Sequence, residues 1–163
     1  MQNYVVMGVS GCGKSSVGTA VAHALGGQFI DGDDLHPPQN IAKMAQGQPL
    51  TDADRAPWLE QIGQTLCMQQ DVTVIACSAL KRRYRDIIRR AAGQQVTFLH
   101  LSGTRQVIES RMAARTDHFM PLSLLDSQFA ALQQPSQDER AITVDIDQPF
   151  DVVVAQILTQ ING

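Results

Sequence analysis

The chain has 163 residues, of which 44% are hydrophobic and 18% are charged, and its formal net charge is −3. This length fits one domain with a core large enough to need no disulfide or structural metal. The small negative charge gives no electrostatic basis for binding nucleic acid or an acidic membrane surface, so we expect neither as a main partner.

The cysteines, Cys12, Cys67 and Cys77, are odd in number and form no C-x-x-C pair, which is typical of reduced thiols. No apolar run approaches the roughly 18 residues that a membrane span needs. No basic segment precedes an apolar one at the start of the chain. We therefore expect a cytoplasmic protein without a signal peptide or a membrane span.

The hydrophobic pattern predicts strands and helices in alternation. Short, nearly continuous apolar runs predict strands at residues 4–7, 28–30, 72–77, 96–101 and 142–146. Apolar residues at helical spacing predict helices over residues 16–25, 82–92, 105–115 and 150–161, one that begins after Thr51 and one that follows Pro121. Thr51 is the expected N-cap of its helix, because acidic residues fill the first turn.

The order of elements, β-α-β-α-α-β-α-β-α-α-β-α, predicts an α/β fold. We expect a three-layer α/β/α sandwich with a five-stranded parallel sheet and right-handed crossovers, as a single domain over residues 1–163. Ligands of such sheets bind beyond the carboxyl ends of the strands. Two segments are expected to move: the proline-containing stretch at Asp34–Pro49, and Thr116–Pro121, which interrupts a helical region.

Residues Gly8 to Ser15 match the phosphate-binding pattern G-x-x-x-x-G-K-[ST]. The glycines Gly8, Gly11 and Gly13 let backbone N–H groups point at phosphate oxygens. Lys14 can reach the β- and γ-phosphates, and Ser15 can hold Mg²⁺ through its hydroxyl. Because a predicted strand precedes the motif and a predicted helix follows it, we interpret it as the nucleotide site of a P-loop NTPase fold.

Two aspartates, Asp31 and Asp33, follow the second predicted strand, next to the P-loop in this topology. Phosphoryl transfer needs one carboxylate to help hold Mg²⁺ and another to accept a proton from the attacking hydroxyl. The third strand ends in Ala76-Cys77-Ser78 and not in aspartate, which favours Asp31 for the metal role. That absence, together with the lack of an N-K-x-D motif, argues against the switch GTPases.

Basic residues after the third strand favour an acidic substrate. Lys81 and Arg85 are four residues apart, so we expect them on one helix face near the active end of the sheet. Arg55 is a further candidate anion ligand, since arginine fits a carboxylate in a bidentate manner. Arg89 and Arg90 are expected to lie on a solvated helix face.

Two further arginines, Arg111 and Arg115, lie beside the second mobile segment. Arginines that close over ATP stabilise charge on the transferring phosphoryl group, although surface helix charges are the alternative interpretation.

Histidines and Cys12 allow more than one interpretation. His36, directly after the aspartates, could hydrogen-bond a polyol hydroxyl or be an ordinary loop residue, and His118 has weaker support for a role. His23 and His100 are expected to be structural. Cys12 lies at a helix N-terminus, which lowers a thiol pKa, but it also fits as a small residue at a variable loop position.

Stretches over almost the whole chain, in the same order, resemble the bacterial gluconokinases. They are Met7–Ser15, Phe29–Pro37, Asn40–Met44, Pro49–Leu59, Cys77–Lys81, Tyr84–Asp86, His118–Met120, Gln128–Leu132 and Asp145–Pro149. The one visible departure is Cys12, where that family commonly has serine. The resemblance implies ATP-dependent phosphorylation of the C6 hydroxyl of D-gluconate with Mg²⁺, a shikimate-kinase-like fold of the nucleoside-monophosphate-kinase group, and a homodimer.

The resemblance also implies roles for individual positions. The phosphates and Mg²⁺ would be bound by Gly11, Cys12, Gly13, Lys14, Ser15 and Ser16, with Asp31 assisting the metal. Asp33 would orient the C6 hydroxyl and act as the base, while Arg55, Lys81 and Arg85 would lie near the gluconate carboxylate and hydroxyls. ATP and the closing lid would meet Arg111 and Arg115, and the adenine would pass Gln148 and Pro149. The lid would cover about residues 111–135 and the substrate-binding segment about residues 33–60.

Three alternatives remain open. The nearest enzymes are shikimate kinases and nucleotide kinases, but the former carry a glycine-rich turn where this chain has Cys77–Leu80, and the latter lack the His36-Pro37 segment. A regulatory or binding protein that merely kept the P-loop is the third possibility. The intact Lys14, Ser15 and Asp33 argue against loss of catalysis.

Overall fold

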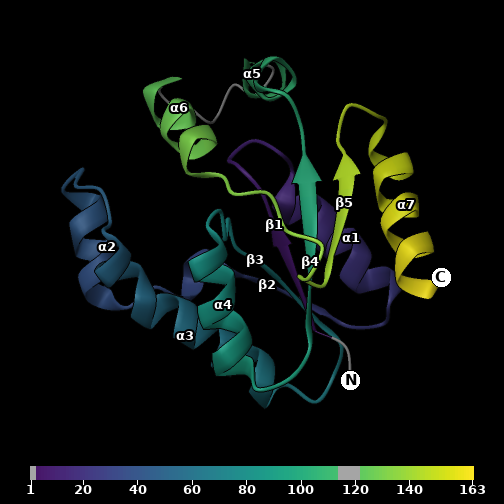
Figure 1. Cartoon of the computed structure of the whole chain (residues 1–163), viewed down its shortest axis with the longest axis horizontal. Coiled ribbons are helices and arrows are strands. Elements are labelled where there is room, and N and C mark those ends of the chain that lie inside the picture. The colour runs from purple at the N-terminus through teal and green to yellow at the C-terminus, as the bar shows by residue number, and fades with distance from the viewer. Residues whose placement is uncertain (1–2, 114–121) are drawn as a thin grey trace.

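The apolar runs form the five strands of one parallel sheet in the computed structural model, which describes residues 3–113 and 122–163. The strands are β1 (Asn3–Met7), β2 (Gln28–Asp31), β3 (Thr73–Ala76), β4 (Val96–Ser102) and β5 (Ala141–Asp145). They lie in the order β2-β3-β1-β4-β5, and every neighbouring pair is parallel. β1 is therefore the central strand (Figure 1).

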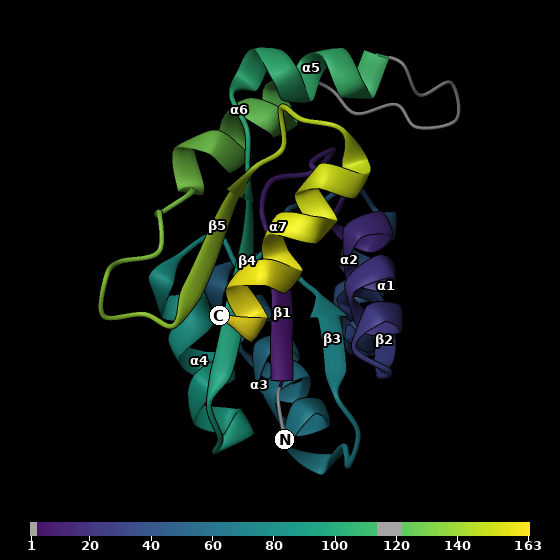
Figure 2. The ribbon, with the colours of Figure 1, turned by 90° about the vertical axis from the view of Figure 1, so that its right-hand side faces the viewer.

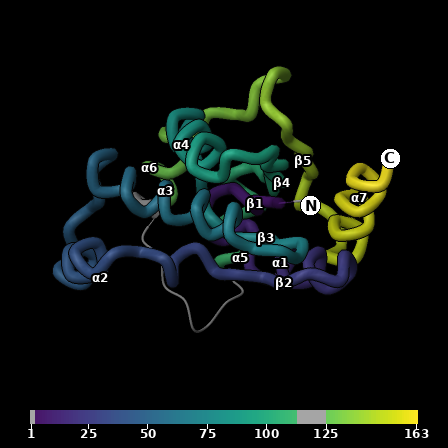
Figure 3. The backbone as a smooth tube through the Cα atoms, turned by 90° about the horizontal axis from the view of Figure 1, so that it is seen from below, coloured from purple at the N-terminus to yellow at the C-terminus, as the bar shows by residue number. Residues whose placement is uncertain are grey.

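Helices cover both faces of this sheet, which confirms the predicted three-layer α/β fold. They are α1 (Lys14–Ala24), the 3₁₀ helix η1 (Gly32–Leu35), α2 (Pro38–Ala45), α3 (Asp52–Met68), α4 (Arg82–Ala92), α5 (Arg105–Ala113), α6 (Leu122–Ala131) and α7 (Phe150–Asn162). Helices α3 and α4 lie on one face, and α1 and α7 lie on the other (Figures 1 and 3). None of the described helices is long and apolar enough to cross a membrane.

The core has two layers because side chains alternate across each strand. On β1, Val6 is fully buried in the cluster that includes α1 and α7, whereas Val5 and Met7 are fully buried in the cluster that includes α3 and α4. Since both faces of the strand are buried, its sequence is continuously apolar, as in other covered parallel sheets.

Helices α5 and α6 lie over the carboxyl edge of the sheet rather than against either face (Figure 2). Ile108 of α5 and Leu125 of α6 are fully buried, in the same cluster as Val9 and Cys12 of the P-loop. The two helices therefore pack on the part of the molecule in which the sequence predicts a nucleotide site.

Element bounds follow the predictions closely. The N-cap prediction is confirmed: the Thr51 hydroxyl accepts the Asp54 N–H at 3.1 Å, and the Asp54 carboxylate accepts the Thr51 N–H at 2.9 Å. The stretch 34–49 contains the end of η1 and the whole of α2, which stands away from the sheet (Figures 1 and 3). Residues 114 and 115 of the helix predicted over 105–115, and the segment 116–121, lie outside the described residues.

Candidate active site

The P-loop takes a conformation that its glycines permit. Gly8, Gly11 and Gly13 have φ angles of 144°, 85° and 93°, which residues with a side chain rarely adopt. A Cβ atom at Gly8 would also lie 2.9 Å from the carbonyl oxygen of Leu101. Among the described residues, no acceptor is found for the N–H groups of Gly11 and Gly13, so they remain available for an anion at the start of α1.

Lys14 folds over this loop. Its ammonium donates to the carbonyl oxygens of Gly8 at 3.0 Å and Val9 at 3.1 Å. Lys14 and Ser15 line the same cavity, whereas Ser16 is exposed and does not line it. The loop thus presents a cation and a hydroxyl on one side, as phosphate binding requires.

The two aspartates lie where β2 turns into η1. Asp31 is the last residue of β2, and its carboxylate accepts the N–H of Asp33 at 3.0 Å. A Cβ atom on the intervening Gly32 would lie 2.3 Å from the carbonyl oxygen of Ala76, so only glycine fits between them. Loss of water around its carboxyl, and then the charge of Asp31, raise the pKa of Asp33 above its usual value.

Two stacked rings, those of His36 and Trp58, line the same cavity as Lys14 and Ser15. The ring of His36 stacks on Trp58 with centroids 4.0 Å apart, and the Trp58 indole N–H donates to the Gly32 carbonyl at 2.8 Å. The Asn40 amide lies 3.3 Å from His36 Nδ1 and donates to the Asp54 carbonyl. Burial lowers the pKa of His36, outweighing the opposite effect of Asp33, which favours a neutral ring at physiological pH.

These elements surround a cavity of about 250 Å³. Six predicted site residues line it, namely Lys14, Ser15, Asp31, Asp33, His36 and Arg55. It is also lined by residues for which the sequence predicts no individual role, namely Ser10, Met44, Leu50, Trp58, Ala76, Cys77, Ser78 and Gln128. Met44, Leu50 and Trp58 lie within the predicted substrate-binding segment of about 33–60, whereas Gln128 has no predicted role in the matching stretch Gln128–Leu132.

Arg55 lines the cavity together with His36 and Trp58. Its guanidinium donates to the Leu50 carbonyl at 2.9 Å and lies 5.6 Å from the centre of the Tyr84 ring. Lys81 lies at the same distance from that ring, and its ammonium is 3.7 Å from the carboxylate of Asp52. Lys81 is therefore close to Arg55 but is not among the residues that line the cavity.

Arg85 does not reach the cavity, so the prediction that it contacts substrate is wrong. Its side chain is fully buried, and its guanidinium is bidentate to Glu139 at 2.7 and 3.1 Å. The remaining N–H groups donate to the carbonyls of Ala79, Leu80 and Gln133. Helix α4 begins at Arg82 with Lys81 as its N-cap, so Lys81 and Arg85 do not share a helix face as expected.

Arg89 also departs from its prediction. Its side chain is only 24% exposed, its guanidinium donates to Asp86 at 2.9 Å and to Glu139 at 2.6 Å, and it lies over the Phe98 ring. Arg90 is exposed, as expected.

Cys12 is buried, with 1% of its surface exposed, and burial raises the pKa of its thiol. The interpretation as an activated thiol is therefore wrong, because loss of water outweighs the effect of nearby Lys14. His100 is buried, as expected for a structural residue, and burial lowers its pKa to about 4.

Arg111 of α5 contacts the β5–α7 connection, which contains the predicted adenine residues Gln148 and Pro149. Arg111 donates to the carbonyls of Ile146 and Gln148, and Pro149 is the N-cap of α7. Arg115 and His118 lie outside the described residues.

Ser15 and Asp31 are the candidate protein ligands for Mg²⁺. Within residues 3–113 and 122–163 no cluster of three His, Cys, Asp or Glu side chains could enclose a metal. Mg²⁺ in phosphoryl-transfer sites needs fewer protein ligands, since it keeps several waters and binds one or two carboxylates plus phosphate oxygens. Ser15 and Asp31 line one cavity with Lys14, so they fit this mode of binding.

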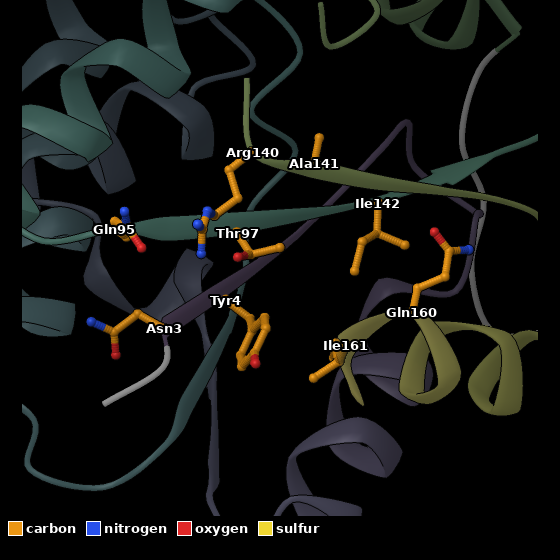
Figure 4. Close-up of a pocket in the computed structure, with 9 residues that line it drawn as sticks. All are labelled: Asn3, Tyr4, Gln95, Thr97, Arg140, Ala141, Ile142, Gln160 and Ile161. Carbon is orange, nitrogen blue, oxygen red and sulfur yellow. The ribbon is translucent and has the colours of Figure 1, made fainter. Parts of the chain in front are cut away.

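A separate hollow of about 370 Å³ lies at the opposite, amino-terminal edge of the sheet (Figure 4). Polar side chains such as Arg140, Thr97 and Gln160 line it together with Tyr4 and Ile142. Parallel α/β folds bind ligands at the carboxyl edge. None of the P-loop residues or the two aspartates lines this hollow, so it is not the candidate active site.

A strand, glycine-rich loop and helix, with two carboxylates beside them, define a P-loop phosphotransferase. A family model described as "Shikimate kinase" matches residues 10–161. The thermoresistant gluconokinase of Escherichia coli is 48% identical over 98% of this chain and 93% of its own length. The crystal structure of a gluconokinase from Sinorhizobium meliloti is 49% identical, with a TM-score of 0.90 over 99% of this chain and 91% of its own.

At 17% identity, shikimate kinase from Aquifex aeolicus shares the fold, with a TM-score of 0.65 over 99% of this chain and 97% of its own. The chain therefore belongs to the gluconokinase family, within the set of kinases that the shikimate kinase model describes.

Proposed function

We propose that the protein transfers the γ-phosphoryl group of ATP to the C6 hydroxyl of D-gluconate, giving 6-phosphogluconate and ADP. The observation that carries this proposal is one cavity lined by Lys14 of the P-loop, the carboxylate pair and Arg55. Such a cavity suits a phosphoryl donor together with an acceptor that carries both a hydroxyl to be deprotonated and an acid group. The gluconokinase relatives support gluconate as that acid.

In this mechanism the P-loop N–H groups and Lys14 hold the donor phosphates. The C6 oxygen attacks the γ-phosphorus in line, the bond from that phosphorus to the ADP oxygen breaks, and the hydroxyl proton passes to the Asp33 carboxylate. Arg55 pairs with the gluconate carboxylate and His36 bonds a hydroxyl, which fixes the acceptor for attack. Catalysis is thus mainly positioning and stabilisation of charge.

Ser15 and Asp31 would hold Mg²⁺ next to the phosphates. When bound, the ion neutralises charge that develops on the donor oxygens. This role explains why a carboxylate that is not the base lies so close to Asp33.

The lid belongs to the same proposal. Arg111 and Arg115, in the lid predicted over about 111–135, would meet ATP and stabilise the transferring group, and the segment of about 33–60 would bind the acceptor. Helix α6 lies within this predicted lid but is held against the core by the buried Leu125, so this part of the lid would not move. The adenine would pass Gln148 and Pro149. Family resemblance further supports a homodimer and a cytoplasmic location, which size-exclusion chromatography with light scattering and cell fractionation would test.

A coupled ADP-release assay tests the proposal. The purified protein is given ATP and Mg²⁺ with gluconate, idonate, shikimate or a nucleoside monophosphate in turn. We expect the highest kcat/KM with gluconate, and loss of both turnover and ATP binding in Lys14→Ala. A preference for shikimate or a nucleotide would reject gluconate as the substrate, and no transfer to any acceptor would favour a binding protein.

A further inference from the structure

Gln128 of α6 is joined to the P-loop by two hydrogen bonds that close a ring. Its carbonyl oxygen accepts the backbone N–H of Ser10 at 2.6 Å, and its amide nitrogen donates to the Ser10 hydroxyl oxygen at 3.0 Å. The two residues are 118 positions apart in the chain. The carboxamide therefore has one defined orientation relative to the loop that would hold the donor.

The helix that carries Gln128 is fixed at several points. Leu125 is fully buried in the core, and the chain beyond α6 is bonded to the β3–α4 connection. There the N–H of Gln133 donates to the Leu80 carbonyl at 2.7 Å, and the Gln133 side chain accepts the Arg82 N–H at 2.9 Å. These contacts hold the helix without help from the Ser10 pair, so the pair is not needed as its anchor.

The hydrogen-bonding capacity of Gln128 exceeds what Ser10 uses. A carboxamide has two N–H donors and two acceptor lone pairs, and Ser10 takes one of each. Gln128 lines the same cavity as Lys14, Asp33 and Arg55. One remaining donor and one remaining acceptor match an alcohol, which both accepts and donates, better than a phosphate oxygen, which only accepts.

We propose that Gln128 is a substrate-binding residue that determines acceptor specificity: held in place by Ser10, its carboxamide binds a secondary hydroxyl of the polyhydroxy acid. This inference rests on the proposed function and adds a ligand from α6 to it. Arg55 binds the carboxylate of the acceptor, and Gln128 recognises a hydroxyl between that carboxylate and the reacting C6 end. The amide is neutral, so it adds no further negative charge beside the two aspartates.

Steady-state kinetics of Gln128→Met test this role, since methionine keeps the length of the side chain and removes both hydrogen bonds. We expect the KM for gluconate to rise about 3- to 10-fold, the worth of one neutral hydrogen bond, while the KM for ATP changes less than about twofold. Gln133→Met is the matched control, because it loses an anchoring bond outside the cavity. It should lower thermal stability at least as much and leave both KM values unchanged.

Deoxy acceptors distinguish substrate binding by Gln128 from a purely structural role of this residue. Acids lacking one secondary hydroxyl at a time are compared in the wild-type protein and in Gln128→Met. If Gln128 binds a given hydroxyl, its removal from the substrate raises KM in the wild-type protein but not in the variant, which is the non-additive result of a double-mutant cycle. Additive effects for every hydroxyl, an unchanged KM for gluconate, or an effect confined to ATP would each overturn the proposal.

The two proposals fail separately. If the wild-type protein phosphorylates gluconate but Gln128→Met behaves like its control, only the role of Gln128 is rejected. If the wild-type protein prefers another acceptor from the panel, the gluconate assignment is rejected, and the same KM comparison with that acceptor decides the role of Gln128.

Discussion

The N–H of Asp33 donates to the carboxylate of Asp31 at 3.0 Å, so one tight turn holds both carboxylates at the end of β2. Gly32 makes this turn possible, since a side chain there would collide with the Ala76 carbonyl. The closeness of two like charges contributes to the raised pKa of Asp33, which makes it a stronger base once it is ionised. The same geometry leaves Asp31 beside the P-loop, where a cation would compensate its charge.

Asp33→Asn should abolish turnover while ATP binding stays within about twofold of the wild-type value. Loss of a positioned base costs about 10²- to 10⁴-fold in rate, whereas the P-loop contacts are untouched. Calorimetry with ATP and initial rates with gluconate measure the two effects. Asp34→Asn, at an exposed neighbour that does not line the cavity, is the control and should behave like the wild-type protein. A wild-type kcat in Asp33→Asn would remove Asp33 from the role of base.

The rate should also fall at acidic pH. Asp33 must be ionised to accept a proton, and its pKa is raised, so kcat should decline at a pH above the ordinary 3.8 of an aspartate. His36→Asn is the control for titration of the nearby histidine, and this variant should show the same decline of kcat at acidic pH. A kcat that stays constant down to the ordinary aspartate range would contradict the raised pKa or the role of Asp33.

Arg55→Gln should raise the KM for gluconate at least tenfold and leave the KM for ATP nearly unchanged. Arg55 is the arginine that lines the cavity in the described part of the chain, and a charge-assisted bond to a carboxylate contributes about 1.5–3 kcal/mol. Arg90→Gln, on the exposed surface of α4, is the matched control. An equal rise of both KM values would indicate a general disturbance of the site instead of recognition of the acid.

Glu139→Gln should destabilise the fold by about 3–5 kcal/mol, because it leaves the buried Arg85 guanidinium without its counter-charge. Asp138→Asn breaks the neighbouring but exposed pair with Arg82 and should destabilise the fold far less, because water screens this pair. Urea unfolding of both variants makes the comparison. Similar losses of unfolding free energy in the two variants would show that burial does not determine how much these ion pairs contribute to stability.

The contacts of Glu139 with Arg85 and Arg89 should also make the free energy of unfolding depend on pH. Burial raises the pKa of Glu139, but hydrogen bonds from Arg85 and Arg89 outweigh it and hold the pKa at about 2, below the ordinary 4.5. Because the folded-state pKa is the lower one, the stabilisation is fully present above pH 4.5 and is lost as the pH falls towards 2. Glu139→Gln should therefore show a weaker loss of stability over this range than the wild-type protein.

Thiol reagents should modify Cys67 before the other cysteines. Cys67 is exposed, whereas Cys12 and Cys77 are buried, and burial raises the pKa of Cys77 to about 12. Peptide mapping after brief treatment with iodoacetamide should find the label on Cys67, with activity retained. Early labelling of Cys12 together with loss of activity would contradict its burial.

The sheet and the P-loop could be predicted because their signals are local. Continuous apolar runs marked the strands, and glycines at fixed spacing marked a loop that needs positive φ angles at Gly8, Gly11 and Gly13. The turn at Asp31 and Asp33 could also be placed, since parallel strands bring their carboxyl ends to one edge.

The environment of the arginines could not be predicted in the same way. Arg85 is paired with Glu139, 54 residues away, and no local pattern shows that a carboxylate will be buried there. Gln128 and Ser10 meet only because α6 folds back over the loop. For Cys12, the helix N-terminus and burial have opposite effects on the thiol pKa, and only the structure shows that burial is the larger one.

The most direct test of the central claim is the identity of the product. The protein is incubated with ATP, Mg²⁺ and gluconate, and the product is analysed by ³¹P NMR with phosphorus–proton coupling and by mass spectrometry. Phosphorus coupled to the two C6 protons, in a yield that matches ADP, is the predicted result. Phosphate on another carbon, inorganic phosphate alone, or unchanged gluconate would contradict the account.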